Sequence, residues 1–504
     1  MLAAIHSAAV LGIDAYDVTV EVDCARGLPQ WFIVGLPAGS VRESRERVGA
    51  ALVNSGFTIP PRRITTNLAP ADRPKSGTAF DLPIALGILA ATGQIPAESV
   101  RDLVVVGELG LDGSVRSVRG ALPVARLVAA SEGRTLVLPA HNVAEASLVS
   151  AVPLASPRNL VELVEWLRSG GMLPRASARC APSARERPVD LADVAGQESA
   201  KRAMEIAAAG AHNALMIGPP GSGKTMLARR LPGILPALGE EEALEVIAIQ
   251  SVAGLLASAS TLISERPFRA PHHTISDAGL IGGGNPPRPG EVSLAHNGVL
   301  FLDELLEFRR HVVEALRQPM EDGSVTIARA SGTVAFPARF ALVGAMNPCP
   351  CGQAGDPARR CTCAASEISR YRARLSGPMA DRIDLHVHVG RIPVAQLAGG
   401  RESRESSASV RERVERARER QRARFERVAG VSCNAHAPAR WTGQWLGAAA
   451  DALRLVAEAA ETLGFTARSY HRVLRVARTI ADLDGEHTVR DAHVAEALAY
   501  RPVA

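Results

Sequence analysis

Apolar and polar positions follow two periodicities along the first third of the chain, that of strands and that of helices. "DVTVEVDC" (17–24) and "WFIVGLP" (31–37) follow the two-residue repeat of strands. "SVRESRERVGAALVNSG" (40–56), which ends at a glycine, and "DLPIALGILAATG" (81–93) predict helices. "LVVVGELGLDGSVRSV" predicts a hairpin that turns at Asp112-Gly113. These segments indicate an α+β domain over residues 1–168.

The pattern changes twice more along the chain. Residues 169–190 are rich in Gly, Pro, Ser and Arg without apolar periodicity, which predicts a linker. Residues 191–390 show apolar strand runs separated by helices, as in a mostly parallel α/β sheet. Residues 391–504 form a last domain, in which "SVRERVERARERQRARFERV", "AADALRLVAEAAETLG" and "SYHRVLRVARTIADL" predict helices.

Composition narrows the classes of protein. A chain of 504 residues with 47% hydrophobic and 22% charged residues is long enough for two to four globular domains. Aromatic residues make up only 4%, so base stacking is not expected as the main binding device, and the net charge of +5 permits a polyanionic partner. No signal-peptide pattern and no apolar run near 18 residues is present, so we expect a cytoplasmic protein without a membrane span.

A phosphate-binding loop is predicted at "GPPGSGKT" (218–225), between the apolar strand "NALMI" and the helix "MLARRL". Gly221 and Gly223 allow backbone N–H groups to surround phosphate oxygens at a helix N-terminus. Lys224 would neutralise the β- and γ-phosphates, and Thr225 would bind Mg²⁺. We therefore expect ATP and Mg²⁺ on Gly218, Pro219, Pro220, Gly221, Ser222, Gly223, Lys224 and Thr225.

Two further strands end in polar residues of the same chemistry. "GVLFLDE" (298–304) ends in Asp303, suited to Mg²⁺, and in Glu304, suited to orienting the attacking water. "FALVGAMN" (340–347) ends in Asn347, which can reach the γ-phosphate or the water. In a parallel sheet these strand ends line one crevice.

The order of these motifs resembles the magnesium-chelatase-like AAA+ ATPases and, over nearly the whole chain, the YifB/ComM family. "FRAPHHTIS", "GGGNPPRPGEVSLAHNGVLFLDEL", "AMNPCPCG" and "GPMADRIDLHV" carry the resemblance. It implies an AAA+ P-loop core with a helical lid. It also implies that Arg382 is a finger for the neighbouring subunit's nucleotide and that Arg468 is a second sensor. A finger in trans requires a homo-oligomeric ring, in this superfamily most often a hexamer.

The N-terminal domain resembles the Lon-protease-like domain, which has the fold of ribosomal protein S5 domain 2. The stretches "RPKSGTAFDLPIALGILAATG" and "VVVGELGLDGSVRSVRGALPVARLVAA" carry this resemblance. Where Lon proteases have a nucleophilic Ser and a Lys, this chain has Ala79 and Leu122. Lys75 and Ser76 are adjacent in sequence and precede the expected site. A Ser–Lys pair is therefore missing, which predicts a proteolytically inactive module.

Four cysteines lie in the stretch "NPCPCGQAGDPARRCTC" (347–363). The first of them, Cys349, comes two residues after Asn347. Cys349, Cys351, Cys361 and Cys363 would form a closed tetrahedral site, which favours structural zinc. Reduced thiols and a redox switch stay open as alternatives. The family pattern also carries this loop. Cys24, Cys180 and Cys433 are isolated and are expected to be ordinary residues.

Three segments could face a substrate. His272 and His273 are expected on opposite sides of an extended segment, so we do not expect them to share a metal. "GSVTIARASGTVAF" (323–336) predicts a hairpin with Arg329 near its tip, where it either contacts DNA phosphate or is merely solvated. For the helix at 411–427 we expect a solvated face with pairs such as Glu412–Arg416, and a DNA-facing role stays open.

The resemblance implies a motor that acts on branched DNA, since members of this family are linked to branch migration in recombination and natural transformation. The alternative is a chelatase-like or protein-remodelling ATPase that acts on a partner protein. The residues themselves separate an ATPase from other classes of protein, and they do not choose between these two substrates.

Overall fold

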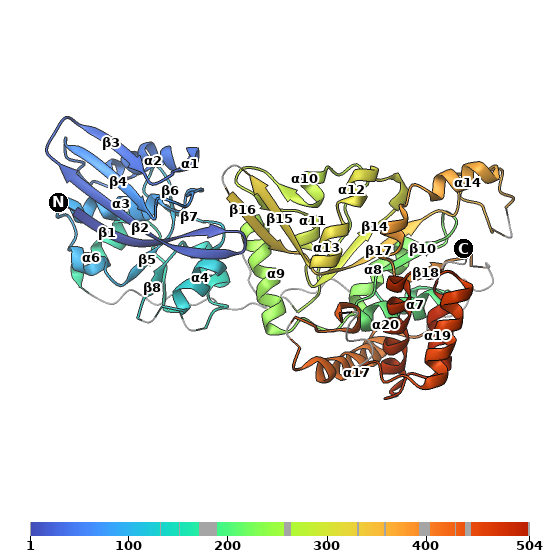
Figure 1. Cartoon of the computed structure of the whole chain (residues 1–504). Coiled ribbons are helices and arrows are strands. Elements are labelled where there is room, and N and C mark those ends of the chain that lie inside the picture. The colour runs from blue at the N-terminus through green and yellow to red at the C-terminus, as the bar shows by residue number, and fades with distance from the viewer. Residues whose placement is uncertain are drawn as a thin grey trace.

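The chain divides into two folded bodies that lie side by side in a computed structural model, with the N-terminus at one end and the C-terminus near the other (Figure 1). The structure describes residues 2–131, 133–150, 152–170, 189–256, 264–329, 332–356, 359–392, 404–428, 430–438 and 445–501. Most of the predicted linker, with Cys180, lies outside these residues. We refer to residues 2–170 as the N-terminal part, 189–392 as the P-loop part and 404–501 as the helical part.

A seven-stranded mixed sheet forms the N-terminal part, in the order β3-β4-β2-β1-β5-β8-β9. The strands β1 and β2 form a long antiparallel hairpin, whereas β5, β8 and β9 are parallel to each other. The predicted hairpin at Asp112-Gly113 is confirmed as β6 and β7. The strands are β1 Leu2–Leu11, β2 Asp14–Ala25, β3 Gln30–Val34, β4 Arg63–Ala69, β5 Leu103–Val105, β6 Glu108–Leu109, β7 Val115–Arg116, β8 Thr135–Val137 and β9 Leu154–Ala155.

Helices cover this sheet as the apolar pattern requires. All eleven residues of α3 are buried, because this helix is apolar on every side and packs on β1 and β2. The predicted helix at 40–56 is two helices, α1 and α2, which meet at Glu43. The helices are α1 Gly39–Arg42, α2 Ser44–Asn54, α3 Asp81–Ala91, η1 Ala97–Val100, α4 Ala121–Ala129, α5 Ala140–Ala146 and α6 Leu160–Ser169.

The P-loop part contains the predicted parallel sheet, in the order β11-β14-β17-β10-β18. Its central strands are buried apolar runs, as expected for a parallel sheet with helices on its faces. The strands are β10 Ala214–Ile217, β11 Phe268–Arg269, β14 Gly298–Leu302, β17 Phe340–Met346 and β18 Leu385–His388.

Two hairpins and several helices complete this part. The predicted hairpin at 323–336 is confirmed as β15 and β16, and a second, shorter hairpin is formed by β12 and β13. The hairpin strands are β12 Gly282–Gly283, β13 Arg288–Pro289, β15 Ser324–Arg329 and β16 Gly332–Pro337. The helices are η2 Leu191–Asp193, α7 Glu198–Gly210, α8 Lys224–Ile234, α9 Glu240–Ala253, α10 Asp277–Leu280, α11 Glu291–Leu294, η3 Leu305–Glu307, α12 Arg310–Glu314, α13 Arg317–Asp322, α14 Ala365–Arg372 and α15 Gly377–Ala380.

The helical part packs below the P-loop part (Figure 1) and consists of α17 Ser407–Phe425, η5 Asn434–His436, α19 Ala450–Thr462, α20 Ala467–Asp484 and α21 Asp491–Ala499. The expectation of a solvated α17 is wrong for one of its faces, which is buried against α7, α8 and α20. Arg413 pairs with Glu205 at 2.5 Å, and Arg416 donates to the backbone oxygen of Glu412 at 3.3 Å. Arg413 therefore links α17 to α7, whereas Arg416 bonds within its own helix.

The N-terminal part docks on the P-loop part through α4 and α9. Leu122 is fully buried against Ile247 and Ala248 of α9. The carboxylate of Glu145 accepts hydrogen bonds from Ser251 on α9 and from the backbone N–H of Leu122. The β1–β2 hairpin also extends to α9 and β16 (Figure 1). Leu122, which the resemblance places where Lon proteases have their lysine, is thus part of an interface with the P-loop part. Within the described residues, no helix is long and apolar enough to cross a membrane.

Candidate active site

The phosphate-binding loop follows β10 and leads directly into α8. Gly221 and Gly223 have φ angles of +78° and +94°, the left-handed conformations that favour glycine. Lys224 Nζ donates to the carbonyl oxygens of Gly218 (2.6 Å) and Pro219 (3.0 Å). Burial lowers the pKa of Lys224, although Asp303 and Glu304 act in the opposite direction. A β- or γ-phosphate would replace these carbonyl contacts with a stronger, charge-assisted one.

The predicted acidic residue and sensor meet this loop at the carboxyl edge of the sheet. Thr225 Oγ1 donates to Asp303 Oδ2 at 2.7 Å, so the two predicted Mg²⁺ ligands are neighbours. The Oδ1 atom of Asn347 lies 3.4 Å from Lys224 Nζ. The strands that carry these residues, β14, β17 and β10, are adjacent. Residues 123 positions apart in the sequence therefore meet at one edge of the sheet, where we expect the nucleotide.

Glu304 occupies an unusual backbone position directly after β14. Its φ of +51° is left-handed, and its N–H donates to Asp303 Oδ1 at 3.0 Å. A non-glycine residue in this conformation is typical of functional sites, where surrounding structure maintains local strain. The side chain is 60% exposed, so its carboxylate is accessible to a water molecule.

Glu304 has a neighbour that its sequence motif did not predict. His273 Nδ1 lies 3.9 Å from Glu304 Oε2. The expectation that His272 and His273 point to opposite sides is wrong, because their ring centroids are 4.1 Å apart. The chain turns at His273 and Thr274, so strand geometry does not apply there. The available signal was that these histidines follow the short strand β11, but only the strand order places that strand beside β14.

The two predicted arginines lie together, but not at this nucleotide site. Both Arg382 and Arg468 form an ion pair with Glu321 on α13, and the Arg468 Nη2–Glu321 Oε1 distance is 2.7 Å. The side chain of Arg382 is only 5% exposed, whereas that of Arg468 is 49% exposed. Burial lowers the pKa of Arg382, and the nearby positive charges of Arg468, Arg317 and Arg472 act in the same direction.

Strand register separates Arg382 from the P-loop of its own chain. Leu385 in β18 pairs with Ala214, at the start of β10, whereas the P-loop follows the end of β10. Arg382 precedes Leu385 by three residues and therefore lies at the opposite edge of the sheet. Four strand residues span about 13 Å. A finger function for Arg382 thus requires a nucleotide from another subunit.

The four cysteines converge as a metal site requires. All four Sγ atoms lie within 4.8 Å of one another. The distances from Cys349 to Cys351 and Cys361 are 3.4 and 3.7 Å, and Cys351 to Cys361 is 3.6 Å. Tetrahedral zinc with Zn–S bonds of about 2.3 Å would separate its sulfurs by about 3.8 Å. The donor set therefore fits zinc, with no position left for a substrate.

This cysteine loop also contacts the nucleotide site. A Cβ atom at Gly352 would lie 2.6 Å from Cδ of Pro220 in the P-loop. Asp356, with a fully buried side chain, forms an ion pair of 2.6 Å with Arg391 beyond β18. The loop is thus fixed between the P-loop and the end of a neighbouring strand.

Comparison with known proteins agrees with this arrangement over nearly the whole chain. Residues 190–397 match the family "Magnesium chelatase, subunit ChlI", residues 20–142 match "Subunit ChlI of Mg-chelatase", and residues 404–501 match its C-terminal family. The Competence protein ComM of Haemophilus influenzae is 44% identical, over 99% of this chain and 97% of its own length. The chain belongs to the YifB/ComM family of magnesium-chelatase-like AAA+ proteins.

Other relatives show how far the likeness extends. The YifB protein of Escherichia coli is 43% identical over 100% of this chain and 97% of its own length. The magnesium-chelatase 38 kDa subunit of Rhodobacter capsulatus is 30% identical, but over only 34% of this chain and 55% of its own length. Membership of this AAA+ family supports an ATPase with ATP and Mg²⁺ as ligands. The likeness to YifB/ComM proteins includes the N-terminal part, whereas that to the chelatase subunit covers a third of the chain.

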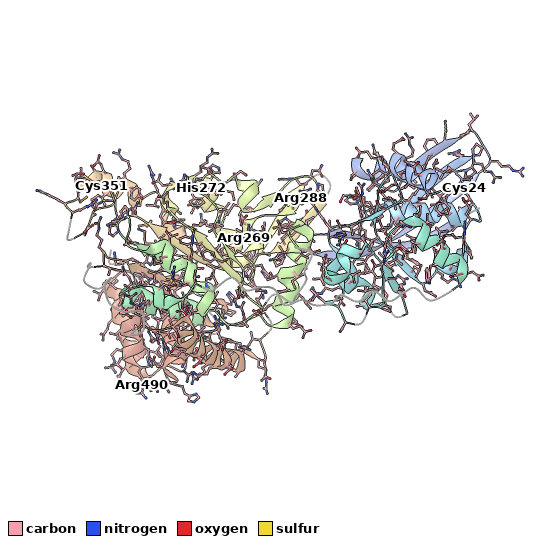
Figure 2. The ribbon with its side chains drawn as sticks, turned by 180° about the vertical axis from the view of Figure 1, so that it is seen from behind. Cys24, Arg269, His272, Arg288, Cys351 and Arg490 are labelled. Atoms are coloured by element: carbon pink, nitrogen blue, oxygen red, sulfur yellow. The ribbon has the colours of Figure 1, made fainter. Side chains whose placement is uncertain are left out.

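The remaining predicted residue, Arg329, lies at the end of β15 and is exposed. Its Nη2 atom is 3.5 Å from the place that a Cβ at Gly283 would take, so the β15–β16 and β12–β13 hairpins are neighbours. Arg288, on β13, is exposed as well. In Figure 2, Arg288 is labelled on the side of the P-loop part that faces the N-terminal part, and Cys351 at the far end.

Proposed function

We propose that this protein is a ring-forming ATPase that couples ATP hydrolysis to the remodelling of DNA, by branch migration or helicase activity on branched substrates in recombination or natural transformation. The observation that carries the ATPase is the meeting of Lys224, Thr225, Asp303 and Asn347 at one sheet edge. In this proposal Lys224 and Thr225 hold the phosphates and Mg²⁺ together with Asp303. Glu304 orients the attacking water, and Asn347 holds the γ-phosphate.

The position of Arg382 supports the ring. Arg382 lies at the edge opposite its own P-loop, so a site that uses Arg382 as its finger needs a second copy of the chain. Arg382 and Arg468 share Glu321, so the phosphates of a bound nucleotide would compete with that carboxylate for Arg382 as the finger and Arg468 as the second sensor. We propose a closed homo-oligomer, as is usual for AAA+ proteins, with six subunits.

Exposed positive charge and the name of one relative support DNA as the substrate. Arg329 and Arg288 are exposed on adjacent hairpins, and the net charge of the chain is +5. A full-length relative is named a competence protein. Since aromatic residues are few, contacts to phosphate would supply most of the affinity, which should fall steeply with salt and depend little on base sequence.

The decisive experiment measures the ATPase rate of the purified protein at low salt with a four-way DNA junction, with linear duplex and without DNA. We expect the junction to stimulate most and the duplex less. Arg329→Ala should weaken this stimulation and leave basal turnover unchanged, because Arg329 lies on a hairpin outside the strand ends where we expect the phosphates of ATP. If neither DNA changes the rate, the DNA function is wrong.

A second candidate is an ATPase that remodels a partner protein, as a chelatase-type motor. The observations in its favour are the match of residues 190–397 to the family "Magnesium chelatase, subunit ChlI" and the 30% identity to the magnesium-chelatase 38 kDa subunit over 34% of the chain. We would favour this second function if DNA has no effect on the ATPase rate.

We also propose that Cys349, Cys351, Cys361 and Cys363 hold one structural zinc ion per chain. Sulfur–sulfur distances of 3.4 to 3.7 Å support it. Metal analysis of protein purified without chelators should find about one zinc per chain. Protein without zinc would show that the cysteines act as thiols.

A further inference from the structure

The two histidines of "FRAPHHTIS" have no place in the function proposed so far, although they stand at the carboxyl edge of the sheet. Strand β11 is parallel to β14, and Arg269 pairs with Leu300. His273 is four residues beyond Arg269, and Glu304 is four residues beyond Leu300. Matching positions beyond two paired strands therefore bring these side chains to the same level of the crevice.

The imidazole of His273 is held on several sides. Its ring lies 4.1 Å from that of His272 and meets Phe308 edge-on at 6.4 Å. His272 is fixed in turn, since its Nδ1 lies 2.9 Å from the hydroxyl oxygen of Thr274. The side chain of His273 is 33% exposed, compared with 60% for Glu304. The histidine is thus the better fixed member of the pair.

The carboxylate of Glu304 lacks any other support. Within the part of the chain that the structure describes, it makes no hydrogen bond or ion pair except the 3.9 Å approach to His273 Nδ1. A long, exposed glutamate populates several rotamers, whereas orienting a water for attack needs one. The 3.9 Å distance exceeds that of a hydrogen bond, and a small rotation of Glu304 would close it.

The segment that begins at His273 leads to the hairpins. Ser276 caps α10 by accepting a hydrogen bond from the N–H of Gly279, and β12 and β13 follow. The hairpin of β12 and β13 carries Arg288 and lies against Arg329. Figure 2 labels His272 between Cys351 and Arg288 on the same side of the P-loop part. One continuous segment therefore joins the catalytic edge to the surface proposed for DNA.

We propose that His273 is a positioning residue that orients the carboxylate of Glu304, and that the segment 270–290 transmits binding at the hairpins to this contact. The second half rests on the proposed DNA function, whereas the first half concerns basal hydrolysis alone. In this proposal His273 contacts neither ATP nor the attacking water. Its effect passes through Glu304, as its side chain donates to the carboxylate when the gap closes.

The test compares His273→Ala, His273→Asn and the control His311→Ala in steady-state ATPase assays without DNA. His311 is a suitable control because it forms a similar exposed pair, 3.3 Å from Asp277 on α10, and lies on α12. His273→Ala should lower kcat by about 10- to 100-fold while KM stays nearly constant, because only the orientation of the water is lost. His273→Asn, which keeps an N–H donor, should recover part of the rate, and His311→Ala should resemble the wild type.

Two further measurements separate positioning from damage to the fold. Binding of a fluorescent ATP analogue should be unchanged in His273→Ala, since the P-loop is intact. In a Glu304→Gln background, His273→Ala should cause no additional loss, because both changes act on the same group. An unchanged or increased kcat in His273→Ala, or additive losses in the double variant, would overturn the positioning role.

The transmission is tested by adding a synthetic four-way junction at low salt. His273→Ala should bind the junction as the wild type does, but the ratio of stimulated to basal rate should fall toward one. An unchanged ratio refutes transmission through His273. If the junction does not stimulate even the wild type, the DNA function fails, while the basal result for His273 stands.

Discussion

Replacing Gly352 with alanine tests whether the cysteine loop controls the P-loop. A Cβ atom at this position would lie 2.6 Å from Cδ and 2.9 Å from Cγ of Pro220, closer than real Cβ contacts. Gly352 also has a φ of +78°, which side chains disfavour. The alanine must therefore push Pro220 away or move the cysteine loop, and Pro220 belongs to the loop that binds phosphate.

The structure provides a matched control for the size of the effect. Gly355 lies in the same loop with a φ of +79°, but a Cβ there would meet nothing within 4 Å. Gly355→Ala should therefore cost only the left-handed strain, about 1–2 kcal/mol. Gly352→Ala adds overpacking, which typically costs about 1–3 kcal/mol. If this second cost falls on the P-loop, ATP affinity decreases by about 5- to 100-fold, since a tenfold change corresponds to about 1.4 kcal/mol.

The assay is a titration of each variant with a fluorescent ATP analogue, together with a thermal unfolding curve. We expect both variants to unfold at a lower temperature than the wild type, and only Gly352→Ala to lose ATP affinity. Equal ATP affinities in the two variants would refute the reasoning, because the contact with Pro220 would then have no influence on the nucleotide site.

Four other changes test the nucleotide site and the docking of the N-terminal part. Lys224→Ala should reduce ATP affinity by about 10- to 100-fold, because a charged contact to the phosphates is lost, and an equilibrium binding assay would show it. Glu304→Gln should bind ATP normally but hydrolyse it roughly 100-fold or more slowly, which a turnover assay would show. Arg382→Ala should retain ATP affinity and lose turnover by about 10³-fold or more. Mixing it with Lys224→Ala subunits should restore activity, because the Lys224→Ala subunit still supplies Arg382 to an intact P-loop of its neighbour. Mixed rings without activity would argue against a finger in trans. Burial raises the pKa of Glu145, despite hydrogen bonds from Ser251, Leu122 and Asn142 that act to lower it. The folded state then holds the proton more tightly than the unfolded state. This carboxyl therefore contributes stability at low pH, and the contribution is lost as pH rises above about 4.3. Glu145→Gln should flatten that part of a curve of unfolding free energy against pH, and an unchanged curve would contradict this role of Glu145.

The sequence by itself predicted the nucleotide site because its motifs are local. Lys224 and Thr225 follow one apolar strand, Asp303 and Glu304 follow a second, and Asn347 follows a third. Each apolar run defines a buried strand, and parallel strands place their carboxyl ends at one edge. The meeting of Thr225 with Asp303 at 2.7 Å thus follows from sequence order and general geometry. The convergence of the four cysteines was equally local, because they lie within fifteen residues.

Only the tertiary structure decided what depends on strand order and on packing between distant segments. The sequence did not show that β11 lies beside β14, which places His273 near Glu304 and not on the far side of an extended segment. It did not show that Arg382 and Arg468 share Glu321, or that Leu122 is buried by α9. Such contacts join residues far apart in the chain, and local periodicity fixes which face of an element is apolar but not which partner covers it.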